Sequence, residues 1–190
     1  MSKLTRLMTI KNFSDFLLES STHSYGCAMI FFDAKSMADL QSKIANEDLY
    51  TTTEVDAFGL EMTPHVTLLY GIHDDKVNDE DVIRACCKID VQMIVLCNVS
   101  CFENEKFDVL KFDVYCPELT ILNKELKKFP YTDKFPEYHP HSTVAYLKPG
   151  KGKEYVKKLS AGSFTVIPSK IVYSKPDGTK KEKMLTNEIV

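Results

Sequence analysis

Two short segments of this 190-residue chain share one pattern, a histidine followed two positions later by a threonine. The segments are Pro64-His65-Val66-Thr67-Leu68-Leu69-Tyr70 and Pro140-His141-Ser142-Thr143-Val144-Ala145-Tyr146, with the histidines 76 residues apart. Both are rich in β-branched and aromatic residues and begin after a proline, which predicts β-strands. Because residues i and i+2 of a strand point to the same face, we expect His65 to project with Thr67 and His141 with Thr143. A fold that brings these strands together builds one site from two imidazoles and two hydroxyls.

The remaining pattern predicts two similar halves, in each of which a helix precedes a motif strand. These helices are expected at residues 34–45 and from Pro117 to about residue 130, where proline is well suited to the first helical position. Further strands are expected at 25–33, 92–102, 106–115, 164–174 and 181–186, further helices at 78–89 and 153–159, and an edge strand is possible at 49–55. Strand 106–115 alternates with one slip in register. We therefore predict an α+β fold of two lobes, with two antiparallel sheets facing a central cleft and helices outside. Residues 1–22 are expected to be an N-terminal helical extension, ahead of one domain at residues 23–190.

The composition limits the class of ligand and the compartment. The net charge is −3, so no global basic field favours duplex nucleic acid, and a small anionic ligand fits better. Six cysteines without a CxxC pair indicate reduced thiols and a cytoplasmic protein, although an even count in a secreted chain would suggest disulfides. No signal peptide and no apolar stretch of about 18 residues is visible, so no membrane association is expected. The oligomeric state is not predicted.

The paired motifs suggest acid–base chemistry on a phosphodiester without a metal or other cofactor. An imidazole can be neutral or protonated near neutral pH, so one histidine can accept a proton while the other donates one. Thr67 and Thr143 can hydrogen-bond the non-bridging phosphate oxygens. A single histidine on a strand is usually structural, but two copies in matching contexts favour function. A metal site using His139, His141 and a carboxylate is the competing interpretation, but it gives the threonines no role. His139 fits better as a loop residue.

Three further residues are candidates for substrate binding. Tyr25, at the start of the first strand, is either a core aromatic residue or a ring that stacks on a nucleobase. Phe102, at the end of a strand, could do the same. Lys175 belongs to a lysine cluster around the last predicted hairpin, which is either a solvated edge or a flap that faces phosphate.

The pairs His65-Val66-Thr67 and His141-Ser142-Thr143 resemble the signature of the 2H phosphoesterase superfamily. The superfamily includes bacterial RNA 2′,3′-cyclic phosphodiesterases and the animal and viral 2′,5′-oligoadenylate phosphodiesterases. The resemblance covers residues 25 to 186 and implies a bilobal α+β fold and metal-free cleavage at ribose phosphates.

Four stretches also resemble the phage anti-CBASS protein 1 family, namely residues 25–29 (YGCAM), 59–61 (GLE), 64–71 (PHVTLLYG) and 139–147 (HPHSTVAYL). Those proteins degrade the cyclic di- and trinucleotides, such as cGAMP, by which bacteria signal phage infection. This resemblance implies a hydrolase active in the bacterial host cytoplasm, with His65, Thr67, His141 and Thr143 as catalytic residues and Tyr25 as the base-stacking residue. The family also places a tryptophan against a base. This chain has no tryptophan, so that contact is lost or made by another residue, such as Phe102.

Three other functions stay open at this point. An RNA-end enzyme would open 2′,3′-cyclic phosphates, or form or cleave 2′–5′ links, and would need a longer basic groove. A catalytically idle module would only sequester a cyclic nucleotide, although both His/Thr pairs are intact. A structural protein would use the fold as a scaffold.

Overall fold

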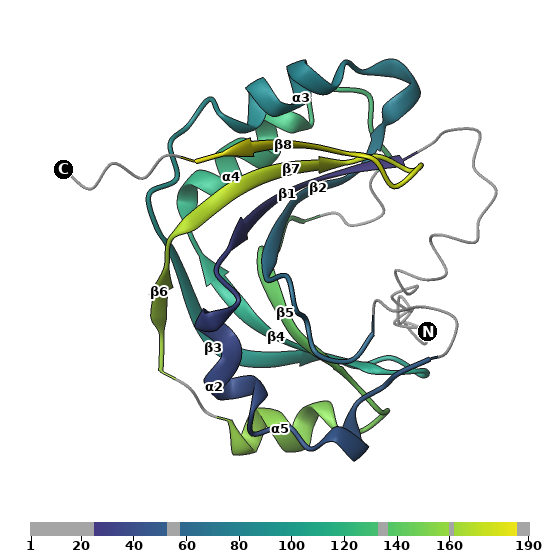
Figure 1. The fold of residues 1–190 in the computed structure, drawn as a ribbon, viewed down its shortest axis with the longest axis vertical. Helices are drawn as coiled ribbons and strands as arrows, with labels where there is room; N and C mark the ends of the chain where they lie inside the picture. Colours follow the sequence, from purple (N-terminus) through teal and green to yellow (C-terminus); the bar gives the residue numbers. More distant parts are fainter. Residues whose placement is uncertain (1–24, 53–57, 133–136, 160–161, 186–190) are drawn as a thin grey trace, which may run out of the picture.

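The structure is a computed structural model, and it describes residues 25–52, 58–132, 137–159 and 162–185. These residues form two four-stranded antiparallel sheets that curve around a common interior, with helices on the outside (Figure 1). The predicted α+β class with two antiparallel sheets and external helices is therefore confirmed. The helical extension predicted for residues 1–22 lies outside the described residues.

The two motif strands, β2 and β5, are each the edge strand of a different sheet. Sheet A has the strand order β2-β1-β7-β8, and sheet B has the order β5-β4-β3-β6. The strands are β1 (Tyr25–Phe32), β2 (His65–His73), β3 (Ile94–Phe102), β4 (Asp108–Tyr115), β5 (His141–Leu147), β6 (Phe164–Val166), β7 (Pro168–Ser174) and β8 (Lys180–Met184). The helices are α2 (Lys35–Gln41), α3 (Asp79–Cys86), α4 (Pro117–Leu126) and α5 (Gly152–Lys158), with 3-10 turns η1 (Asn46–Asp48) and η2 (Asp74–Lys76). Strands β2 and β5 pack against each other, so the two sheets meet at the motifs.

The helices cover the outer faces of the sheets and exchange partners between the two halves. Helix α4 precedes β5 in the chain but packs on β2, while α2 precedes β2 but packs on β5. Helix α3 lies beside α4 over β7 and β8, and α5 covers β3 and β4 (Figure 1). The apolar stripe of α4, which consists of Leu119, Leu122 and Leu126, is fully buried. Because each motif strand is covered by the helix that leads into the other one, the halves share one hydrophobic core.

The segments that lead into the motif strands also cross over. Residues 59–61 pair along the free edge of β5 before the chain enters β2, and residues 130–132 pair along the free edge of β2 before it enters β5. This second pairing is close enough to require glycine at position 71. Gly71 has φ +91°, and a Cβ atom there would lie 2.0 Å from the carbonyl oxygen of Thr132.

Three of the sequence-based expectations for strands need correction. The single strand predicted for residues 164–174 is two strands in different sheets, since the chain leaves sheet B after Val166 and enters sheet A at Pro168 (Figure 1). Pro168 has no N–H for the ladder, and Ile167 between the strands is exposed. The irregularity predicted in the alternation of strand 106–115 is instead a bulge in the neighbouring strand β5, opposite Leu110 and Lys111. In the region 49–55, Leu49 forms an isolated bridge to Leu147, and residues 53–57 lie outside the description.

All six cysteines are free thiols. Among the described residues, no helix is both long enough and apolar enough to cross a membrane.

Candidate active site

A bulge in each motif strand sets which side chains face the interior. Leu68 has no partner in the register of β1, and Val144 has none in the register of β4. The chain therefore buries two successive residues on the helix side of each strand, and the side chains before and after return to the inner face. As a result, His65, Thr67 and Tyr70 share the inner face of β2, and His141, Thr143 and Tyr146 share that of β5. The sequence correctly predicted that each histidine lies on the same face as its threonine.

Both histidines are anchored in the same way, by the residue two positions earlier. The Nδ1 atom of His65 donates to the carbonyl oxygen of Thr63 at 2.9 Å, and that of His141 donates to the carbonyl oxygen of His139 at 2.9 Å. A carbonyl oxygen only accepts, so the Nδ1 atom must carry the proton in both rings. Each Nε2 atom is then left to accept a proton when the ring is neutral, or to donate one when it is charged.

The two imidazoles lie close enough to interact electrostatically. Burial lowers the pKa of His141 below its usual value, and the charges of Lys111 and His65 lower it further. The hydrogen bond to the His139 carbonyl and the charge of Asp113 act in the opposite direction. Within sheet B, the ring of Phe102 on β3 meets that of His141 on β5 edge-on, with 5.1 Å between the centroids. His141 is therefore favoured in its neutral form, in which Nε2 can accept a proton.

Each threonine hydroxyl has an uncharged neighbour on the same inner face. Burial raises the pKa of the Cys27 thiol to about 12, and the nearby Thr67 hydroxyl opposes this shift. Burial and the charge of Glu61 raise the pKa of the Tyr146 hydroxyl, and the nearby Thr143 hydroxyl opposes this shift. Each threonine therefore sits between a histidine and a neutral side chain that does not compete with it for an anion.

Of the three residues predicted to bind substrate, only Phe102 lies against a motif histidine. Tyr25 lies on the inner face of sheet A, but it pairs with His73 and not with His65. It is three inner-face positions along β1 from Phe31, the partner of His65. At ~3.3 Å per residue, this is roughly 20 Å along the strand. Lys175 lies at the same end of sheet A, where its Nζ pairs with Asp79 at 3.4 Å and Asp74 at 3.9 Å. These two carboxylates raise the pKa of Lys175 and neutralise its charge.

Four inner-face residues beside the histidines were missed from the sequence. Phe31 lies opposite His65 across the strands, with 5.0 Å between the ring centroids. Asp113 lies opposite His141, and Lys111 lies opposite Thr143. Ser100 completes this group by donating to Asp113 at 2.8 Å. The available signal was Lys111 and Asp113 at alternating positions of a strand in which Asp108 is the only other charged residue, which places Lys111 and Asp113 on one face.

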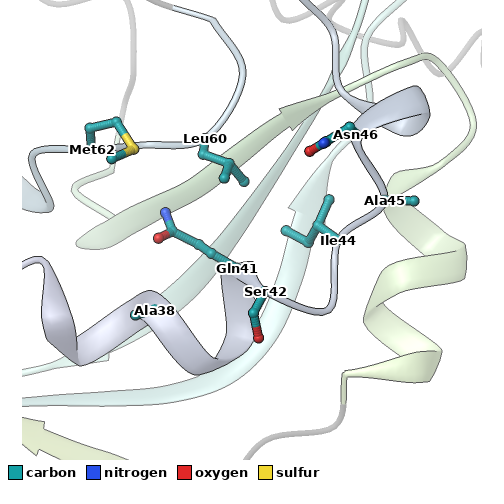
Figure 2. Close-up of a pocket in the computed structure, with 8 residues that line it drawn as sticks. All are labelled: Ala38, Gln41, Ser42, Ile44, Ala45, Asn46, Leu60 and Met62. Atoms are coloured by element: carbon teal, nitrogen blue, oxygen red, sulfur yellow. The ribbon is translucent and has the colours of Figure 1, made fainter.

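One surface hollow among the described residues lies away from these side chains. It has a volume of about 520 Å³ and lies between α2 and the segment that contains Leu60 and Met62 (Figure 2). Figure 2 shows the Gln41 amide pointing toward this segment, where it donates to the carbonyl oxygen of Glu61 at 2.8 Å.

His139 is an exposed loop residue that pairs with Glu137 at 3.4 Å. Within the part of the chain that the structure describes, no three His, Cys, Asp or Glu side chains are grouped as metal ligands.

Comparison with known proteins gives distant structural similarities only. No protein-family model and no curated protein sequence matches the chain. Usb1 of Kluyveromyces marxianus, solved with uridine monophosphate, is 12% identical over 85% of this chain and 98% of its own, with a TM-score of 0.48. LigT of E. coli, solved with 3′-AMP, is 13% identical over 86% of this chain and 95% of its own, with a TM-score of 0.49. A further structure described only as a phosphoesterase is 13% identical over 86% of this chain and 96% of its own, with a TM-score of 0.46.

Proposed function

We propose that this protein is a metal-independent phosphodiesterase of the 2H type that cleaves 3′–5′ linkages in cyclic di- and trinucleotides. One observation carries the proposal. Two histidines on separate strands have equivalent Nδ1 anchors, which leave both Nε2 atoms outside these bonds, and each histidine lies on the same face as a threonine. This arrangement supplies a general acid, a general base and two hydroxyl donors for phosphate oxygens.

The reaction proceeds by attack of the substrate's own hydroxyl. One Nε2 accepts the proton of a ribose 2′-hydroxyl as the 2′ oxygen forms a bond to the adjacent phosphorus. The bond from phosphorus to the 5′ oxygen breaks, and the second Nε2 donates its proton to that oxygen. The products are a 2′,3′-cyclic phosphate and a free 5′-hydroxyl.

A second step can then open the cyclic phosphate with water. The histidine that donated its proton is now neutral and accepts one from the attacking water. The other histidine, now charged, returns its proton to the 2′ oxygen as the bond from phosphorus to that oxygen breaks. Both rings end in their starting protonation states. A linkage without a free neighbouring hydroxyl is not cleaved.

Two features support a small cyclic substrate over a long nucleic acid. The chain carries a net charge of −3, so it lacks the overall positive charge with which proteins bind long phosphate backbones. The sequence around both motifs also resembles the anti-CBASS family. We therefore propose that the protein destroys cyclic oligonucleotide immune signals in the cytoplasm of a bacterial host, as a phage counter-defence enzyme. Tyr25 and Phe102 would stack on the bases, at opposite ends of the substrate.

The test is incubation of the purified protein, in EDTA, with three substrate sets. These are 3′,3′-cyclic dinucleotides including cGAMP, cyclic trinucleotides, and linear RNAs ending in 2′,3′-cyclic phosphate. Cleavage of the cyclic oligonucleotides but not of the RNA ends supports the proposal. Action on RNA ends alone replaces it with RNA-end processing, and tight binding without turnover replaces it with a sequestering module. Activity that EDTA removes and a divalent cation restores contradicts the metal-free mechanism.

A further inference from the structure

The two halves of the site have the same motif but different neighbours at equivalent positions. On β1, the residues opposite Thr67 and His65 are Met29 and Phe31. On β4, the residues opposite Thr143 and His141 are Lys111 and Asp113. The sheet A half therefore places apolar side chains beside its histidine and threonine, whereas the sheet B half places an ion pair there.

Lys111 is buried on the functional face and held in one position. Its side chain is 8% exposed, and its Nζ donates to Asp113 Oδ1 at 2.6 Å and to Ser100 Oγ at 2.7 Å. The Nζ also lies 4.5 Å from the ring centroid of Phe102, which in turn contacts His141. Burying an ammonium group is costly unless it is paired, and such a pair adds little to stability over an apolar one. An apolar residue such as Met29 serves at the equivalent position in the other half, so packing alone does not require a lysine.

Each element packed around His141 contributes a group that faces its ring. Strand β4 contributes Lys111 and Asp113, and β2 contributes His65. The preceding loop contributes the His139 carbonyl, while the His139 ring is exposed and pairs with Glu137. Strand β3 contributes the uncharged ring of Phe102. Lys111 thus supplies the fixed positive charge among these groups, and a nearby cation opposes protonation of an imidazole.

We propose that Lys111 is the positioning residue that makes the two histidines unequal, keeping His141 as the general base and leaving His65 as the general acid. This inference rests on the proposed function. In the first step, neutral His141 takes the 2′-hydroxyl proton and charged His65 donates to the 5′ oxygen. The roles reverse in the hydrolysis of the cyclic phosphate. Lys111 acts through His141, without itself accepting or donating a proton.

The first test measures His141 directly in the free protein, by NMR titration of the histidine rings. Lys111→Met copies the residue found at the equivalent position in sheet A. Loss of the nearby cation should raise the pKa of His141 by about half a unit or more. Lys170→Met is the matched control, since the Lys170 ammonium lies 5.5 Å from the Phe31 ring on the His65 side and pairs with Glu182 at 3.0 Å. It should leave the His141 pKa unchanged.

The double variant Lys111→Met/Asp113→Asn keeps the inference testable if Lys111→Met alone fails to fold. It removes both members of the ion pair, so no unpaired buried charge remains. The reference for the double variant is Asp113→Asn, which also lacks the carboxylate opposite His141. The double variant should have the higher His141 pKa of the two, because only it also lacks the Lys111 ammonium. An unchanged His141 pKa in Lys111→Met, equal His141 pKa values in the double variant and Asp113→Asn, or an equal rise in Lys170→Met overturns the inference.

The second test separates acid from base with a substrate that needs no general acid. In uridine 3′-(4-nitrophenyl phosphate), the nitrophenolate leaves without being protonated, while the 2′-hydroxyl must still lose its proton. His65→Ala should keep most of its turnover on this substrate and His141→Ala should lose it. The opposite result overturns the assignment of roles. If the unmodified protein cleaves neither this substrate nor any cyclic oligonucleotide, the proposed function fails, and the NMR titration still decides whether Lys111 acts on His141.

Discussion

The side-chain amide of Asn123 donates a hydrogen bond to the carbonyl oxygen of Leu68 at 2.7 Å, which joins α4 to the bulge of β2. Gln41 of α2 does the same for Val144 of β5, at 3.0 Å. Leu68 and Val144 each lie three residues after a motif histidine and are the positions that their neighbouring strands skip. The two bulges that shape the inner face are thus held by equivalent amides on the two exchanged helices.

Replacing Asn123 by alanine should destabilise the fold without touching the inner face. Asn123 is buried, and its loss leaves the Leu68 carbonyl without this donor, which costs about 1–3 kcal/mol of unfolding free energy. Urea unfolding followed by circular dichroism measures the change. Lys124→Ala is the control, since Lys124 is the exposed neighbour on the same helix and should change stability by less than about 0.5 kcal/mol. Equal stability of the two variants would show that this hydrogen bond does not hold the bulge.

The histidine variants test the site itself. His65→Ala and His141→Ala should each lower kcat on the natural substrate by at least about 100-fold, the usual contribution of a general acid or base. Both side chains are only partly buried, so thermal unfolding should remain cooperative. His139→Ala is the matched control, because its side chain is 76% exposed and its carbonyl still anchors His141. Undiminished turnover in either of the first two variants contradicts the assignment.

The threonine hydroxyls should act mainly in the transition state. Thr67→Val and Thr143→Val keep the shape of the side chain but remove the donor, and kcat should fall by about 10²–10³ with little change in KM. Serine at either position retains the hydroxyl and should retain most of the activity. Steady-state kinetics on a cyclic dinucleotide measures both constants. A rise in KM alone would assign the threonines to substrate binding in the ground state.

Tyr25 should affect substrate binding more than the chemical step, because it lies three inner-face positions along β1 from the partner of His65. Stacking of one base on an aromatic ring contributes about 1–3 kcal/mol, so Tyr25→Ala should raise KM by about tenfold while kcat changes little. Tyr25→Phe keeps the ring and should behave like the unmodified protein. If Tyr25→Ala leaves KM unchanged, the base does not reach this end of sheet A.

The sequence was sufficient to predict the two motif strands and most of the local structure. Strand periodicity is local, so the faces of His65, Thr67, His141 and Thr143 could be read directly. Helix α4 was similarly recognisable from Pro117 and its leucine stripe. The catalytic roles of these four residues stay a prediction that the activity measurements test.

Only the tertiary structure decided which residues surround the histidines. Lys111 lies opposite Thr143 because β4 pairs with β5 in one particular register, and no local pattern encodes that register across some 30 residues of intervening chain. The same holds for the exchange of α2 and α4, and for the passage of the chain from sheet B into sheet A at Ile167. The sequence left Lys175 as either part of a solvated edge or a phosphate-facing residue, but the fold brings Asp74 and Asp79 to it from distant positions. Residue type and period are local properties of the chain, whereas charge pairing and burial depend on contacts between distant segments, which exist only in the folded state.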